Sequence, residues 1–161
     1  MTEIKYATGN LVDAFINNEV NVLIHQANCF CTMNSGIAKE IKQKLPEMFQ
    51  ADCETIKGHP SKLGNYTKAI YKNGTEIKVG YNLYGQYRYG TGEQYTDYKA
   101  IRKGLKSIAW SLDLAKAAGF NAKIGLPLIG CGLAGGDWNV VQQIIQEELV
   151  DKGFNVSVYT L

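Results

Sequence analysis

The sequence predicts an α/β protein, a three-layer α/β/α sandwich around a mixed, mostly parallel central sheet, formed by one domain of residues 1–161. Strand-like and helix-like segments alternate along most of the chain, which is the order that produces a parallel sheet covered by helices. An apolar run at residues 20–27 is typical of a strand buried on both faces of a sheet. One hairpin signal, Asn73-Gly74, interrupts the alternation and predicts an antiparallel strand.

The expected strands are short segments bounded by glycine, asparagine or polar residues. The last of them alternates apolar and polar residues, as expected for a strand with one face buried. They are residues 4–8, 20–27, 66–71, 76–84, 123–128 and 154–161.

The expected helices follow from apolar residues that recur every three or four positions. The clearest is the helix that starts at Tyr98, and Gly119 is placed to end it in a left-handed cap. Ser35 can cap an earlier helix, which Pro46 interrupts. They are residues 11–16, 36–45, 47–57, 98–118 and 138–149.

Length and composition describe an ordinary globular protein. The chain has 161 residues, of which 45% are hydrophobic and 20% charged, enough to bury a core without disulfides or metal. A formal net charge of +2 argues against a protein built to coat nucleic acid or an anionic membrane. Because no membrane span and no signal peptide are evident, we expect a cytoplasmic protein that is a monomer and has no membrane partner.

The cysteines and histidines predict neither a metal site nor a cofactor. The four cysteines have no Cys-x-x-Cys spacing, so free thiols are expected, and two histidines are too few for a convincing metal site. A nucleophilic Cys131 is disfavoured because no histidine lies near it in the sequence. Tyrosine is frequent between Tyr81 and Tyr95; core filling is the favoured interpretation, and a ring-stacking surface is the alternative.

Residues 129–138 form the most informative segment, a glycine-rich loop between a predicted strand and a predicted helix. Gly130, Gly132, Gly135 and Gly136 let the backbone adopt positive φ and approach a ligand. Successive N–H groups can then form an anion-binding concavity beside a helix N-terminus, which suits a phosphate or diphosphate. A tight turn without a ligand is the structural alternative. The loop also satisfies G-x-G-x-x-G, but too little chain follows it for a dinucleotide-binding Rossmann unit.

A second loop supports the same site. Residues 33–38 are small or polar and run into a predicted helix, so two helix N-termini at one sheet edge can hold a diphosphate. Asn28 follows the buried strand and can hydrogen-bond a sugar hydroxyl; an Asx turn is the alternative.

Taken in order, several segments resemble the macrodomain family, the ADP-ribose-binding modules. The resemblance runs nearly end to end. Within the family, the similar branch is that of the ADP-ribose-1″-phosphate phosphatases and their relatives. The segments are Thr8-Gly-Asn-Leu11, Ile24-His-Gln-Ala-Asn28, Met33-Asn-Ser-Gly-Ile-Ala38, Asn82-Leu-Tyr-Gly-Gln86, Tyr95-Thr-Asp-Tyr98, residues 127–138 and the ending Val158-Tyr-Thr-Leu161.

This resemblance implies a set of ligand-binding residues. Asn10, where many macrodomains have aspartate, is expected to contact the adenine through its amide oxygen, and Asn28 is expected to hold the distal ribose. The two loops are expected to wrap the diphosphate. The full set is Gly9, Asn10, Leu11, Gln26, Ala27, Asn28, Met33, Asn34, Ser35, Gly36, Ile37, Ala38, Gln86, Ile129, Gly130, Cys131, Gly132, Leu133, Ala134 and Gly135.

The catalytic residues are less directly implied. The branch that removes ADP-ribose from acidic side chains uses a lysine and an aspartate, and those positions hold Gln86 and Ala134 here. For phosphate-ester hydrolysis the candidates are His25, as a proton donor or acceptor, and Asp137, which can orient a water. The structural alternatives are a histidine satisfied at a strand end and an aspartate that caps a helix.

We therefore expect binding of ADP-ribose and hydrolysis of a small derivative, foremost ADP-ribose-1″-phosphate to ADP-ribose and phosphate. The alternatives are a non-catalytic binding module or metabolite sponge, and a hydrolase that removes ADP-ribose from modified macromolecules. Nucleic acid is expected as a partner only where it is itself ADP-ribosylated.

Overall fold

A computed structural model describes residues 3–161 and confirms the α/β sandwich predicted from the sequence. The strands are β1 (Lys5–Thr8), β2 (Val22–Ala27), β3 (Tyr66–Asn73), β4 (Glu76–Tyr84), β5 (Lys123–Leu126) and β6 (Asn155–Thr160). The α-helices are α1 (Leu11–Ile16), α2 (Gly36–Lys44), α3 (Pro46–Cys53), α4 (Tyr98–Ala117) and α5 (Trp138–Glu148). Two short 3-10 turns, η1 (Pro60–Lys62) and η2 (Val150–Lys152), complete the elements of the described part of the chain.

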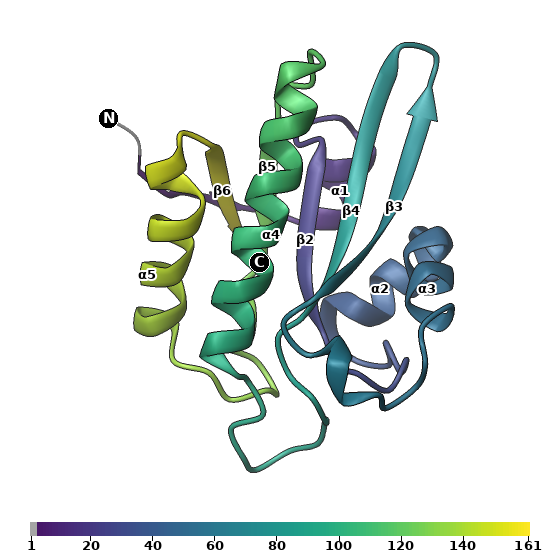
Figure 1. Ribbon diagram of the computed structural model, residues 1–161, viewed down its shortest axis with the longest axis vertical. Helices are drawn as coiled ribbons and strands as arrows, with labels where there is room; N and C mark the ends of the chain where they lie inside the picture. Colours follow the sequence, from purple (N-terminus) through teal and green to yellow (C-terminus); the bar gives the residue numbers. More distant parts are fainter. Residues whose placement is uncertain (1–2) are drawn as a thin grey trace.

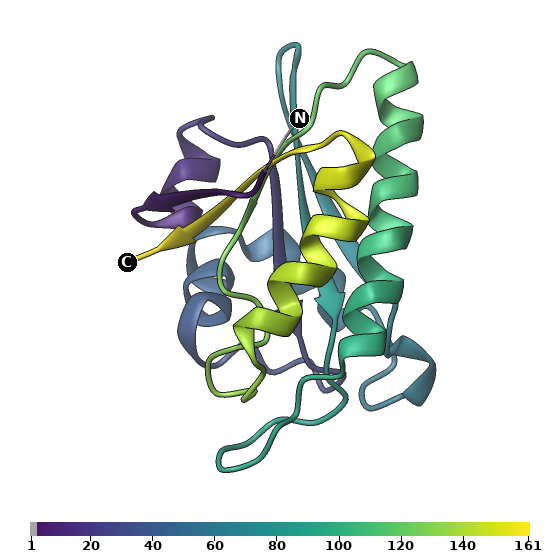
Figure 2. The same ribbon diagram turned by 90° about the vertical axis from the view of Figure 1, so that its left-hand side faces the viewer.

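Six strands of the described chain form one mixed sheet in the order β1-β6-β5-β2-β4-β3. All neighbouring pairs are parallel except β3 and β4, which form the predicted hairpin. Helices α4 and α5 cover one face, and α1, α2 and α3 cover the other (Figures 1 and 2). The carboxyl ends of β2, β4 and β5 therefore meet at one edge, where ligands bind in sheets of this kind.

Two buried clusters hold the layers together. One joins the sheet to α4 and α5 and contains Val22 and Ile24 of β2. The other joins the sheet to α1, α2 and α3 and contains Leu23. Because side chains alternate along a strand, His25 lies on the same face as Leu23, whereas Gln26 lies on the face of Val22 and Ile24.

Several predicted boundaries are wrong by a few residues. The hairpin pairs Asn73 with Glu76, so its two turn residues are Gly74 and Thr75. Pro127 ends β5 at Leu126, because proline has no N–H to donate to a parallel neighbour. Helix α3 ends at Cys53 and not near residue 57, and residues beyond it form turns. None of the helices within residues 3–161 has the length and apolar composition needed to cross a membrane.

Candidate functional site

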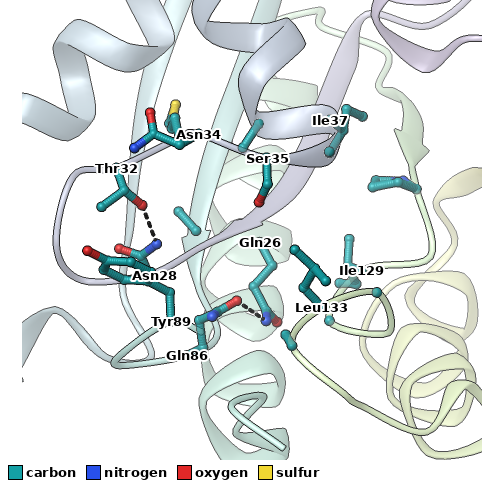
Figure 3. A pocket seen from close by; sticks show the side chains of 18 of the residues that line it. Gln26, Asn28, Thr32, Asn34, Ser35, Ile37, Gln86, Tyr89, Ile129 and Leu133 are labelled. Carbon is teal, nitrogen blue, oxygen red and sulfur yellow. Dashed lines mark hydrogen bonds between the residues drawn. The ribbon is translucent and has the colours of Figure 1, made fainter. Parts of the chain in front are cut away.

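A cavity of about 730 Å³ opens at the carboxyl edge of the sheet, between the two loops singled out in the sequence (Figure 3). The loop after β2 forms one wall, and the glycine loop after β5 forms the opposite wall. The lining residues are Gln26, Ala27, Asn28, Thr32, Met33, Asn34, Ser35, Gly36, Ile37, Ala38, Asp52, Gln86, Tyr89, Gly90, Thr91, Pro127, Leu128, Ile129, Gly130, Gly132, Leu133 and Ala134.

The glycine loop has the backbone geometry of an anion site. Gly130 and Gly135 have φ of 73° and 76°, values that only glycine adopts without strain. Internal bonds of the loop use the N–H groups of Gly135, which donates to Gly132 O at 3.0 Å, and Gly136, which donates to Gly130 O at 2.7 Å. Within residues 3–161, no backbone bond uses the N–H groups of residues 132–134, all three of which line the cavity together with Gly130. Those donors remain available to a phosphate.

The opposite loop, which follows β2, also contains residues with positive φ. Cys31 and Met33 have positive φ, which is rare outside glycine, and Gly36 has φ of 55° at the start of α2. Ser35 occupies the predicted N-cap position, but its hydroxyl makes no capping bond. The first N–H groups of α2 therefore lack a side-chain cap, and they belong to residues that line the cavity, Gly36, Ile37 and Ala38.

Asn28 forms the Asx turn that was the structural alternative, and its contact with a sugar hydroxyl stays a prediction. Its Oδ1 accepts from the N–H of Phe30 at 2.8 Å, which is an Asx turn. Its Nδ2 donates to Oγ1 of Thr32 at 2.7 Å, and both side chains line the cavity (Figure 3). The turn thus fixes the amide at the wall where a sugar hydroxyl was expected.

A glutamine pair occupies the floor of the cavity and ties three loops together. Gln26 Nε2 donates to Gln86 Oε1 at 2.8 Å (Figure 3). The same nitrogen donates to Thr96 Oγ1 at 3.0 Å. Thr96 in turn donates to Gly130 O at 2.6 Å. Gln86 is therefore a hydrogen-bond partner of Gln26; the resemblance places the lysine of other macrodomains at this position. Ala134, which also lines the cavity, has no side chain able to act as an acid or base.

His25 does not reach the cavity. Its side chain is fully buried on the α1–α3 face of the sheet, where Nε2 lies 2.6 Å from Asn82 Oδ1. Burial lowers the pKa of its imidazole, with the hydrogen bond to Asn82 acting in the opposite direction. The structure thus places His25 in the core, with Nε2 paired to Asn82 and Nδ1 without a hydrogen-bond partner among the described residues. It gives no support to direct catalysis, because the residues of β2 that border on the cavity are Gln26 and Ala27.

Asp137 likewise lies outside the cavity lining and acts as a helix cap. Its carboxylate accepts from the N–H of Asn139 at 2.9 Å at the start of α5, and its own N–H donates to Tyr98 Oη at 2.9 Å. This is the structural alternative stated for it from the sequence.

The segment expected at the adenine is separate from the cavity. Gly9, Asn10 and Leu11 do not belong to its lining. Asn10 Oδ1 accepts from the N–H of Asp13 as the cap of α1, while Nδ2 donates to both carboxylate oxygens of Glu40, at 3.1 and 2.8 Å. The adenine role of Asn10 stays a prediction, and its amide already has these partners.

Cys131 and Gly135 are the other expected ligand residues that do not line the cavity. Burial raises the pKa of the Cys131 thiol to about 11, so the thiol is protonated near neutral pH and is a poor nucleophile. The described residues contain no group of three or more metal-ligating side chains.

Sequence reasoning missed several lining residues: Thr32, Asp52, Tyr89, Gly90, Thr91, Pro127 and Leu128. Tyr89 belongs to the tyrosine-rich segment, in which Tyr81 and Tyr84 fill the core while Tyr89 is exposed at the rim. For Asp52, the sequence contains a signal of burial. It lies four residues after Met48, so both occupy the buried face of α3.

Comparison with known proteins settles the family. The family model of the Macro domain matches residues 24–145, which includes both walls of the cavity. The chain belongs to the Macro domain family. The resemblance inferred from the loops is thereby confirmed at the level of the family.

Individual relatives of this macrodomain are distant. An uncharacterized 17.5 kDa protein of Enterobacteria phage T4 is 29% identical over 88% of this chain and 87% of its own length. A DNA ADP-ribosyl glycohydrolase of Thermus aquaticus is 25% identical over 97% of this chain, which spans only 41% of that protein.

Solved structures show the same fold. A protein of unknown function from Bacteroides thetaiotaomicron has a TM-score of 0.77 at 29% identity, with 99% of each chain covered. DarTG of Thermosipho africanus, solved in complex with ADP-ribose, has a TM-score of 0.68 at 17% identity over 98% of this macrodomain and 43% of the DarTG chain.

Proposed function

We propose that this macrodomain binds ADP-ribose in the cavity and hydrolyses an ADP-ribose derivative there. The observation that supports this most directly is the pair of facing loops. Both line the cavity and carry backbone N–H groups that make no backbone hydrogen bond, and no lysine or arginine is among the described residues that line it, so a diphosphate would be held by the backbone. Asn28 and Thr32 offer polar groups for ribose hydroxyls beside these loops.

The foremost substrate is ADP-ribose-1″-phosphate, which would yield ADP-ribose and phosphate. Calorimetric titration should give saturable ADP-ribose binding, and purified protein should release inorganic phosphate from ADP-ribose-1″-phosphate. Binding with no phosphate released would reject this substrate. Absence of ADP-ribose binding would reject the function as a whole. Binding without turnover on any substrate would leave the non-catalytic sponge as the function.

A second candidate is removal of ADP-ribose from nucleic acid, and a charged groove favours it. The groove, about 660 Å³ in volume, lies between α4 and α5 and exposes Lys99, Lys103 and Lys106. It begins at Tyr98, next to the glycine loop, whose Ala134 O accepts from the N–H groups of Tyr95 and Thr96. The DNA ADP-ribosyl glycohydrolase named above is a relative with a matching substrate class.

Loss of ADP-ribose from a modified single-stranded oligonucleotide, followed by mass, tests this second candidate. Changing Lys99, Lys103 and Lys106 together to glutamate should weaken oligonucleotide binding steeply at low salt, because phosphate contacts release counterions. Affinity for free ADP-ribose should be unchanged. Equal oligonucleotide binding by the triple variant would exclude the groove as the nucleic-acid surface.

A further inference from the structure

The cavity contains a buried carboxylate that neither the sequence nor the comparisons assign to any function. Asp52 of α3 is the one carboxylate among the described residues that line the cavity, and its side chain is 1% exposed. Tyr89 is the other lining residue with a group that titrates, and it lies at the exposed rim. A hydrolase that uses only its own side chains as acid or base in this cavity therefore has Asp52 as its natural proton acceptor.

A buried chain of hydrogen bonds leads from the middle of the sheet to Asp52. His25 Nε2 lies 2.6 Å from Asn82 Oδ1, and Asn82 Nδ2 donates to Thr67 Oγ1 at 3.0 Å. Thr67 Oγ1 lies 2.9 Å from Tyr84 Oη, which donates to Asp52 Oδ1 at 2.7 Å. One assignment of hydrogens satisfies every link, with each group donating toward Asp52.

The protonation states favour that assignment. Burial lowers the pKa of His25, so its imidazole is neutral and holds one proton, which Nε2 donates to Asn82. Burial also raises the pKa of Tyr84, so its hydroxyl keeps the proton that it donates to the carboxylate. Buried chains of this type reinforce one another and fix the orientation of their last member.

The second carboxylate oxygen of Asp52, Oδ2, makes none of these hydrogen bonds. Oδ2 is buried and has no hydrogen-bond partner among the described residues, whereas Oδ1 accepts from Tyr84. Lys62 stands 4.0 Å from Oδ1, and its ammonium donates to Cys29 O at 3.0 Å. An unsatisfied buried acceptor is unfavourable. Oδ2 would therefore accept a hydrogen bond from a water or hydroxyl once a small movement of the lining side chains admits one, since the atom itself is covered in this structure.

We infer that Asp52 is the catalytic base of this macrodomain, a role that rests on the hydrolase function proposed above. A water molecule on Oδ2 gives its proton to the carboxylate while its oxygen bonds to the attacked atom of the substrate. The bond from that atom to the leaving group breaks, and its electron pair departs with the leaving group. Asp52 then returns the proton to the leaving group, so atoms and charge balance without a further reactant. Tyr84 is a positioning residue that acts through Asp52.

A purely structural role for Asp52 makes different predictions. Asp52 O accepts from Cys31 Sγ at 3.2 Å, so α3 also supports the loop that lines the cavity. A carboxylate that only held this loop would affect ligand affinity and turnover together. A catalytic base affects turnover alone and sets the acidic limb of the pH profile.

The test compares Asp52→Asn and Tyr84→Phe with Asp113→Asn, an exposed carboxylate of α4 that serves as the matched control. Turnover of ADP-ribose-1″-phosphate and of an ADP-ribosylated oligonucleotide is measured from pH 4 to 9, with ADP-ribose affinity in parallel. Several other titratable and charged groups face Asp52 or lie beside it, and the pH profiles must take them into account. They are His25, Cys29, Cys31, Cys53, Lys62 and Tyr84.

Asp52→Asn should lower kcat by about 100-fold or more, the usual contribution of a general base, with ADP-ribose affinity within about threefold of the parent. Tyr84→Phe should lower kcat while ADP-ribose affinity stays near that of the parent, because Asp52 loses the hydroxyl that fixes its orientation. Asp113→Asn should match the parent.

Three results would overturn the assignment. The first is turnover by Asp52→Asn close to that of the parent, which leaves the hydrolase function intact. The second is loss of affinity in step with turnover in Asp52→Asn. The third is ADP-ribose binding by the parent with turnover of neither substrate, which rejects the hydrolase function as well. If Asp52→Asn does not fold, Tyr84→Phe decides, and a kcat equal to that of the parent, or a loss of affinity in step with kcat, rejects the role.

Discussion

Gly135 offers a sharp test of the claim that the glycine loop is built for its conformation and not merely flexible. Replacing Gly135 by alanine adds one methyl group to a residue with φ of 76°. The new Cβ would lie 2.7 Å from Glu93 O and 3.2 Å from Gln94 Cα, both backbone atoms that cannot rotate away. Gly132, three residues earlier, supplies the matched control, since a Cβ there meets nothing within 4 Å and its φ is not positive.

The expected loss of stability follows from two terms. The left-handed conformation costs an L-residue about 1–2 kcal/mol. Relieving the contact with the 93–94 backbone adds about 1–3 kcal/mol, the usual cost of overpacking. The smaller entropy of the unfolded alanine chain offsets about 0.4–1 kcal/mol. The net decrease in the free energy of unfolding for Gly135→Ala is therefore about 1–5 kcal/mol, with a central value of about 3 kcal/mol.

Denaturant unfolding followed by circular dichroism measures this difference, and for a domain of this size the central value corresponds to a fall in Tm of about 6–12 °C in thermal unfolding. Gly132→Ala should stay within about 0.5 kcal/mol of the parent, as surface substitutions do. Equal stability of Gly135→Ala and Gly132→Ala would refute the reasoning, because the close approach to Glu93 would then not constrain the loop.

Three further predictions test the residues around the site. As the pH falls below about 6.5, the free energy of unfolding should decrease, because His25 takes up a proton in the unfolded chain while burial keeps it neutral in the folded protein. Unfolding measured at several pH values should show a shallower decrease for His25→Gln. Asp137→Ala should lower the free energy of unfolding by about 1 kcal/mol through loss of the cap of α5, whereas Asp137→Ser should retain most of it and ADP-ribose affinity, read by calorimetry, should barely change. Thr96→Val should cost about 1–3 kcal/mol and also weaken ADP-ribose binding, since Gly130 O and Gln26 lose their shared hydroxyl; full affinity in a stable variant would contradict this.

The sequence was sufficient to predict the helices and strands and their arrangement in layers. The apolar stripe of α4 and the apolar run of β2 are local sequence patterns. Each predicts its element with bounds that agree with the structure to within a few residues. The boundaries that differ depend on single hydrogen bonds. Asn73 pairs with Glu76 across the hairpin, and the strand–turn boundary shifts by one residue as a result. The pattern of residue types alone does not determine such pairings.

The walls of the site were also predictable, because their signal is glycine itself. Gly130, Gly135 and Gly36 all adopt the positive φ that makes glycine useful in a loop of this kind. The position of the two loops at one sheet edge follows from the parallel order of β2 and β5. Both walls of the cavity therefore lie where the sequence placed them.

By itself, then, the sequence determined the α/β layering, the two backbone loops and the family, since each rests on spacing within short segments. Only the tertiary structure decided which polar side chains reach the cavity. The alternation of β2 turns Gln26 toward the cavity and His25 into the opposite layer, and a strand's sequence does not state which layer is which. Asp52 reaches the cavity because α3 packs across the end of β4, against Tyr84. The spacing of Asp52 from Met48 indicates burial, but it does not indicate the cavity that the carboxylate reaches, because such long-range packing has no local signature.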